Sequence, residues 1–117
     1  MAALGPKASS ALAELRAAVK SESPDVRIAA AEALANLGHD DEALVVLRAG
    51  LKHESEFIRL AALNVLDRMG SRARPALDDI RAADFPDAKV NASHAADSVR
   101  RMVKYLLGRI AKRAPGE

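Results

Sequence analysis

The sequence predicts an all-α protein built from about three antiparallel helix pairs, and two observations lead to this class. The first is an internal repeat, because PDVRIAAAEALANLG at 24–38 returns 32 residues later as EFIRLAALNVLDRMG at 56–70. The second is the spacing of apolar residues, which recur at intervals of three and four in both copies. A period in the low thirties with helical spacing is typical of stacked helical hairpins. We therefore expect a single domain over 1–117, with repeats at about 6–38, 39–70 and 71–113 and no strands.

Composition limits the kind of core and the kind of function. Only three side chains are aromatic, namely Phe57, Phe85 and Tyr105, so the core must be built from Ala, Leu, Val and Ile. The chain has no cysteine, which excludes a disulfide framework and thiolate chemistry. It also has no apolar run of about 18 residues and no signal peptide pattern, and the compartment stays open.

The basic character of the chain is concentrated near its end. Residues 1–97 hold 12 Lys and Arg against 15 Asp and Glu, whereas residues 98–117 hold 6 against 1. The two net charges, −3 and +5, add to the formal +2 of the whole chain. A basic surface is therefore expected on the last helix and not over the whole molecule.

The first repeat is expected to contain helices at about Lys7–Lys20 and Pro24–Leu37. Ser23 suits the N-cap of the second helix, with Pro24 at the first helical position, where its missing N–H costs nothing. Gly38 suits the left-handed residue that ends this helix. The residues expected to face inward from the second helix are Val26, Ala30, Ala33, Leu34 and Leu37.

The second repeat is expected to contain helices at about Asp41–Lys52 and Glu56–Met69. Asp40 is the expected N-cap of the first of these, and Gly70 follows the second. Gly50 replaces an alanine of the first repeat and should cost about 1 kcal/mol in a helix interior. The inward residues of the second helix are expected to be Ile58, Ala61, Ala62, Val65, Leu66 and Met69.

The third repeat departs from the pattern, as terminal repeats do. A helix is expected at about Pro75–Ala83, followed by a break at 84–89, because Pro86 blocks a continuous helix. The last helix, about Ser93–Lys112, should cover the open end of the array. At the other terminus, Leu4 and Gly5 match the Leu-Gly and Met-Gly pairs that end later helices. We expect either a fragment of a longer array or larger protein, or a short N-terminal cap.

The phrase at 24–38 strongly resembles the short HEAT-like repeats named after phycobilisome lyases, and the resemblance covers about residues 4–83. It implies a right-handed α-solenoid in which the second helix of each repeat lines the concave face. It also implies that Asp25, Arg27 and Arg59 bridge adjacent repeats, although Phe57 stands in the second copy where Asp25 stands in the first. The entry LGPKASSALAEL at 4–15 is similar to HEAT-type tails that follow sulfatase domains in some environmental bacteria.

Catalysis is not expected. His39 and the acids at 40–42 form a local cluster, but metal ligation needs side chains that converge from several elements, so a solvated loop is the better interpretation. Serines fall at helix caps, and no glycine-rich phosphate loop is present. We expect no enzyme activity and no cofactor.

A binding surface is the favoured function, with another protein or the rest of a parent chain as partner. The candidate partner-binding residues are Arg27, Glu32, Asn36, Phe57, Arg59, Asn64 and Arg68. Two alternatives stay open for these residues: the arginines at 27 and 59 could pair with neighbouring acids, and Phe57 could pack near 84–89. The candidate residues for an anionic partner are Arg100, Arg101 and Lys104, although nucleic acid is disfavoured because a single tyrosine is available for stacking on bases.

Overall fold

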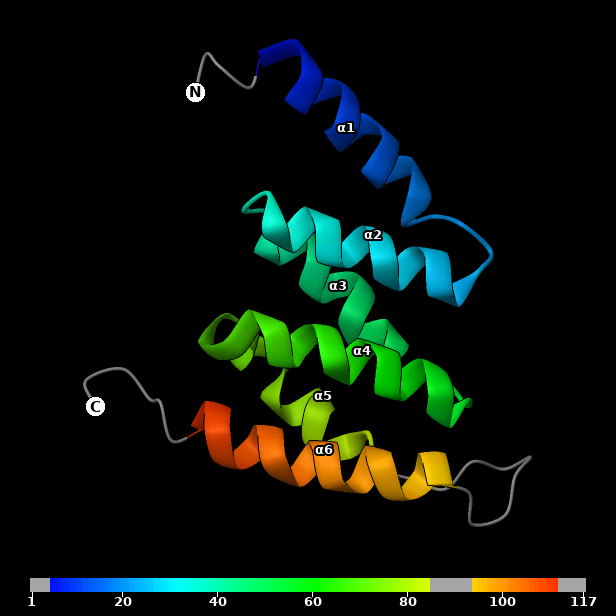
Figure 1. The fold of residues 1–117 in the computed structure, drawn as a ribbon, viewed down its shortest axis with the longest axis vertical. Coiled ribbons are helices and arrows are strands. Elements are labelled where there is room, and N and C mark those ends of the chain that lie inside the picture. The colour runs from blue at the N-terminus through cyan, green and yellow to red at the C-terminus, as the bar shows by residue number, and fades with distance from the viewer. Residues whose placement is uncertain (1–4, 85–93, 112–117) are drawn as a thin grey trace.

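The computed structural model describes residues 5–84 and 94–111, and all regular structure in these two ranges is helical. The helices are α1 (Gly5–Ala18), α2 (Pro24–Asn36), α3 (Asp40–Gly50), α4 (Glu56–Met69), the 3-10 helix η2 (Gly70–Ala76), α5 (Leu77–Ala82) and α6 (His94–Ala111). Figure 1 shows α2, α4 and α6 side by side in one layer, with α3 and α5 behind them. The Cα atoms extend 49 × 40 × 17 Å, and the smallest extent fits two helix layers. The prediction of an all-α solenoid is confirmed.

The ends of α2 follow the sequence signals. The backbone N–H of Val26 donates to the Ser23 hydroxyl at 3.4 Å, and Pro24 is the first helical residue. Gly38 has a φ of +91°, in the left-handed region that a residue with a Cβ rarely adopts. Gly5 is the first residue of α1, while Leu4, the other half of the proposed tail of an earlier helix, lies outside the described residues.

The start of α3 differs from the prediction. Asp40 is the first helical residue and His39 occupies the cap position, so the assignment of Asp40 as N-cap is wrong. The Asp40 carboxylate instead accepts a hydrogen bond from Arg72 of η2 at 2.9 Å. The Asp40 carboxylate therefore links α3 to the next repeat instead of capping the helix.

The third repeat begins with η2 and not with the predicted helix at Pro75–Ala83. Pro75 lies inside η2, and the α-helical part is limited to α5. A 3-10 helix places residues i and i+3 on one side, and Ala73 and Ala76 are both buried. The 3-10 helix thus presents two small side chains to the core, in a segment whose sequence lacks a long apolar stripe.

The inward side of α2 was predicted incorrectly at two positions. Val26 and Leu37 are 44% and 45% exposed, whereas their counterparts 32 residues later, Ile58 and Met69, are 9% and 5% exposed. Figure 1 shows the reason, because α4 lies between α2 and α6, whereas only the obliquely placed α1 lies beyond α2. The predicted inward residues of α4 are all buried except the half-buried Ala61.

Gly50 sits where three helices approach closely. A Cβ on this residue would lie 3.3 Å from the Ala62 Cβ of α4 and 3.5 Å from the Ile28 Cδ1 of α2. Gly50 is the last residue of α3 and not an interior one as predicted, and its lack of a Cβ permits the close packing of α3 on α2 and α4.

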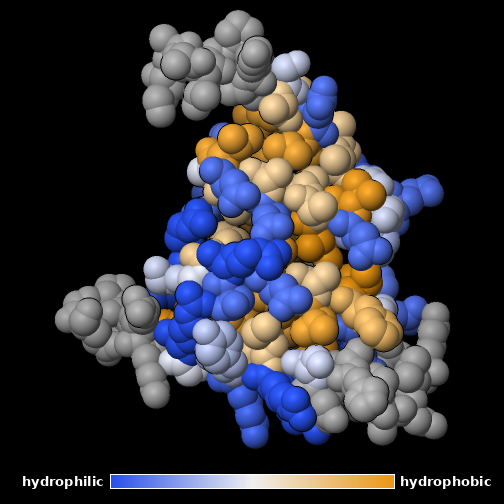
Figure 2. All heavy atoms as spheres, in the orientation of Figure 1, coloured by the Kyte–Doolittle hydropathy of each residue, from blue (hydrophilic) through white to orange (hydrophobic). Residues whose placement is uncertain are grey.

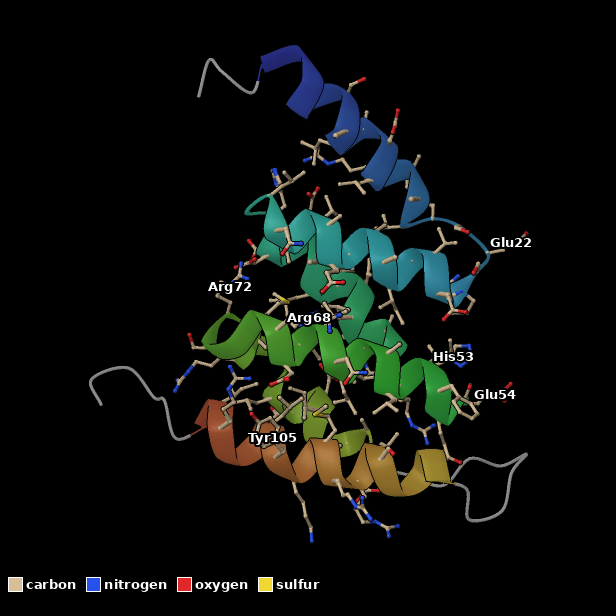
Figure 3. All side chains as sticks on the ribbon, in the orientation of Figure 1. Glu22, His53, Glu54, Arg68, Arg72 and Tyr105 are labelled. Atoms are coloured by element: carbon tan, nitrogen blue, oxygen red, sulfur yellow. The ribbon has the colours of Figure 1, made fainter. Side chains whose placement is uncertain are left out.

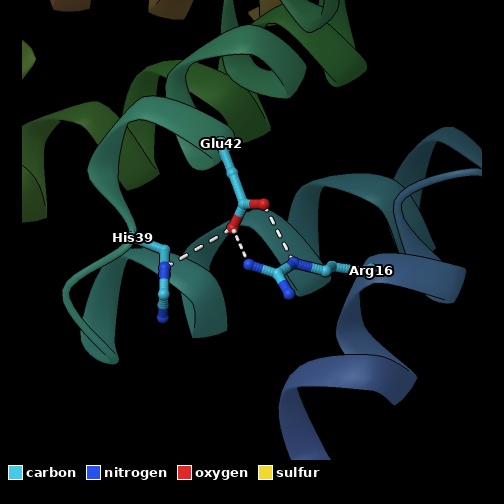
Figure 4. Close-up of polar contacts among 3 residues, drawn as sticks. All are labelled: Arg16, His39 and Glu42. Carbon is cyan, nitrogen blue, oxygen red and sulfur yellow. Dashed lines mark hydrogen bonds and ion pairs between the residues drawn. The ribbon is translucent and has the colours of Figure 1, made fainter.

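Ion pairs on the surface connect one repeat to the next. In Figure 4, Glu42 of α3 accepts from Arg16 of α1 at 2.9 Å and also faces His39 at 3.6 Å. Further pairs join α3 to α5 through Arg48 and Asp79, and α4 to α6 through Asp67 and Arg109. Exposed pairs of this kind contribute up to about 1 kcal/mol each, so they support the stacking that the core determines.

Candidate functional site

The layer of α2, α4 and α6 presents one broad face, and a shallow groove runs along it between α4 and α6. The groove is lined by Leu60 and Asn64 of α4 and by Ser98, Arg101, Met102 and Tyr105 of α6. Figure 3 shows Tyr105 between these two helices. The groove follows from the helical period, because residues three and four apart on each helix share the side that faces the neighbouring helix.

The groove combines an apolar floor with polar edges. Leu60 and Met102 are half-buried and pack against the hydrophobic core. Tyr105 is 55% exposed, although it is one of the largest side chains in the protein. Arg101 is exposed, and no ion pair joins it to any residue in the two described ranges. An unpaired arginine beside an exposed aromatic ring is the residue combination enriched in protein interfaces.

Two predicted residues, Glu32 and Arg68, are paired with each other across α2 and α4. The Arg68 guanidinium donates to the Glu32 carboxylate, and this hydrogen bond raises the pKa of Arg68 above its ordinary value. Figure 3 shows Arg68 on α4, facing the α2 side. The pair is a link between repeats, so neither charge is fully available to a partner. Asn36, near the end of α2, is exposed.

Arg27 and Arg59 hold the loop within their own repeat. Arg27 donates to the Ser21 carbonyl at 2.6 Å, and Arg59 donates to the carbonyls of His53 and Glu54 at 2.8 and 3.1 Å. These contacts differ from the bridge between repeats that the resemblance implied. Arg59 is completely buried, so it is not accessible to a partner.

Phe57 lies in the first turn of α4, away from the groove, and is 67% exposed. The exposure fits the interpretation of Phe57 as an anchor for a partner. The alternative, packing against 84–89, involves residues outside the described part of the chain beyond Asp84.

The basic residues of α6 divide into paired and unpaired cations. The Nε atom of Arg100 lies 3.7 Å from the Oδ2 atom of Asp84, and Arg109 pairs with Asp67 of α4. Lys104, like Arg101, is exposed and has no ion pair with a residue in the described ranges. The anionic-partner surface predicted from the sequence therefore has two unpaired cations and one paired one.

Neither a metal centre nor a membrane span is found among the described residues. No group of three or more His, Cys, Asp or Glu side chains there is arranged to hold a metal ion. No helix in residues 5–84 or 94–111 is long and apolar enough to cross a bilayer. In the cluster at 39–42, Asp40 accepts a hydrogen bond from Arg72 and Glu42 accepts one from Arg16, so these acids link neighbouring helices.

Of the six residues that line the groove, the sequence singled out Asn64 and Arg101, while Leu60, Ser98, Met102 and Tyr105 were not predicted. Leu60 and Met102 look like ordinary core residues in a helical pattern, and each contacts both the core and the groove. The sequence does contain a signal for Tyr105. A large aromatic ring directly after Lys104 falls on the exposed side of α6, and an exposed aromatic side chain indicates a binding surface.

The repeated helix pairs, their stacking and the layer of second helices define a helical-repeat protein of the solenoid class. The sequence matches the family described as HEAT repeats over residues 12–99, which is more than half of the chain, and the protein belongs to that family. No curated protein and no solved structure matched the chain. HEAT repeats generally mediate protein–protein interaction and are typically non-catalytic.

Proposed function

We propose that this chain is a non-catalytic protein-interaction module that holds a segment of its partner in the groove between α4 and α6. The observation that carries the proposal is the groove itself, with Leu60 and Met102 below and Tyr105 and Arg101 at its edge. An aromatic ring and an arginine over an apolar floor match the composition of interface hot spots. The resemblance to HEAT-like repeats supports the same surface, because it implies that the second helices line the binding face.

The experiment is a peptide-display selection against the whole chain, followed by affinity measurements on variants. Tyr105→Ala and Arg101→Ala remove groove side chains, while Lys104→Ala removes a neighbouring exposed side chain that does not line the groove. All three residues are exposed, so each variant should keep the fold. We expect selected peptides to bind the two groove variants roughly 10-fold or more weakly and the Lys104 variant unchanged.

Binders that are insensitive to both groove variants would reject this site. A Phe57→Ala variant in the same assay tests the second candidate anchor, which lies outside the groove. Loss of binding only in the Phe57 variant would move the proposed surface to the start of α4.

A second proposal is that this chain is an accessory C-terminal domain of a larger hydrolase, such as a sulfatase. It is supported by the likeness of 4–15 to the tails of sulfatases, and by the apolar side chains that α2 exposes at Val26 and Leu37. In this case the partner is the rest of a parent chain. The mass of the native polypeptide, measured by immunoblot with an antibody to this domain, tests it: a band near 12 kDa argues against a larger parent.

A further inference from the structure

A half-enclosed pocket of about 230 Å³ lies where α1 ends and α2 begins, beside α3. Its walls are mainly apolar and include Val19, Ile28 and Val46, while its polar side chains are Arg27 and His53. Figure 2 shows apolar surface on this side of the molecule, where α2 and α4 begin, and Figure 3 places His53 there. The pocket is separate from the groove between α4 and α6, since the two have no lining residue in common.

The polar side of the pocket offers hydrogen-bond donors and a positive charge. One Arg27 nitrogen, Nη1, donates to the Ser21 carbonyl, and no ion pair joins Arg27 to any of the described residues. The Nδ1 atom of His53 accepts the Ser55 backbone N–H at 3.0 Å, so a neutral His53 ring carries its hydrogen on Nε2. A half-buried guanidinium without a carboxylate partner favours an anion.

At the corresponding positions of the second repeat, larger side chains are buried. Thirty-two residues after Pro24, Arg27 and Val19, the sequence has Glu56, Arg59 and Leu51, and all three of these side chains are buried. Glu56 and Arg59 are three residues apart and therefore share one side of the first turn of α4. The first repeat has a proline in place of that glutamate and a valine in place of that leucine. It thus lacks one carboxylate and part of the apolar volume that its counterpart buries.

We propose that this pocket binds a carboxylate attached to a short apolar group. The carboxylate pairs with Arg27, which has no ion pair with a described residue, and the apolar group lies against Val19, Ile28 and Val46. The volume fits such a ligand, since an apolar cavity of about 150 Å³ already holds a benzene molecule. A free organic acid and the C-terminal residue of a polypeptide both offer this chemistry.

The test is an NMR titration of the whole chain with 4-methylpentanoate and, as a matched neutral ligand, 4-methylpentanamide. We expect saturable shifts of the Val19, Ile28 and Val46 methyl groups, with a dissociation constant in the millimolar range. The amide should bind at least ~10-fold more weakly, because it cannot form the charge-assisted hydrogen bond to Arg27. An acetylated dipeptide ending in leucine identifies the source: tighter binding than the free acid indicates a polypeptide C-terminus, and equal or weaker binding indicates a free acid.

A variant that copies the second repeat keeps the proposal testable without removing Arg27. Pro24→Glu should place a carboxylate near Arg27 and weaken binding of the acid by ~10-fold or more. Asn36→Glu adds the same charge near the other end of α2 and should leave the affinity unchanged. Equal affinity for acid and amide, native affinity in the Pro24 variant, or absence of shifts at these methyl groups would each overturn the proposal.

Discussion

At the scale of single residues, the same residue type has different roles in the two matched repeats. Arg27 and Arg59 both hold a loop carbonyl, but one lines a pocket and the other is completely buried. Glycine shows the same dependence on surroundings. Gly50 is crowded by Ala62 and Ile28, whereas a Cβ on Gly108 in α6 would meet nothing within 4 Å. The space around the residue, and not its identity, decides what a substitution does.

The glycines give a matched pair of predictions. Gly108→Ala should raise the free energy of unfolding by about 0.5–1 kcal/mol, because alanine is the better helix former and the site is open. Gly50→Ala gains the same propensity but crowds three helices, so we expect a net loss of about 1 kcal/mol. Urea denaturation of both variants measures the difference. A Gly50 variant as stable as the Gly108 variant would show that α3 can move away from α4 at no cost.

At the scale of elements, position in the stack decides which side of a helix is buried. α2 and α4 share an apolar pattern, yet Val26 of α2 and Leu37, directly after it, are exposed, whereas the matching Ile58 and Met69 of α4 are buried. η2 and α5 show a second effect of context, because a 3-10 helix that buries Ala73 and Ala76 precedes α5 and takes in Pro75 and Ala76, the first two residues of the predicted helix.

The copied helices predict unequal effects at equivalent positions. Met69→Ala should cost about 2–3 kcal/mol, since it leaves a cavity in the core. Leu37→Ala, at the matching position of α2, should cost less than about 1 kcal/mol, because half of the side chain already contacts water. Thermal or urea unfolding of the two variants checks this. Similar losses at both sites would mean that Leu37 is covered in solution.

At the scale of the whole molecule, the two ends of the solenoid differ. In the first repeat Val26 and Leu37, near the two ends of α2, are exposed, whereas α6 buries its apolar side and presents Arg101 and Lys104 outward. Since Arg100 and Arg109 are paired with acids, the positive potential of the last helix is weaker than its sequence suggests.

This distribution predicts weak binding to nucleic acid, with a shallow dependence on salt. Two unpaired cations give a slope of about −2 in a plot of log affinity against log salt, which is far below that of sequence-specific binders. We expect elution from a DNA column at low salt, and no retention after Arg101→Gln and Lys104→Gln are combined. Retention at physiological salt would favour the nucleic-acid alternative over protein binding.

The sequence alone determined the fold class, the bounds of α4, the start of α2 at Pro24, the cap at Ser23 and the turn at Gly38, whereas α2 ends one residue before the predicted Leu37. These features depend on local spacing and on the conformational preferences of single residues, and neither depends on which helices pack alongside. Tertiary structure decided the exposure of Val26, the burial of Arg59, and the meeting of Leu60 and Tyr105 in one groove. Burial depends on which helix lies alongside, and two repeats with the same apolar spacing have different neighbours, so no pattern within one repeat could predict it.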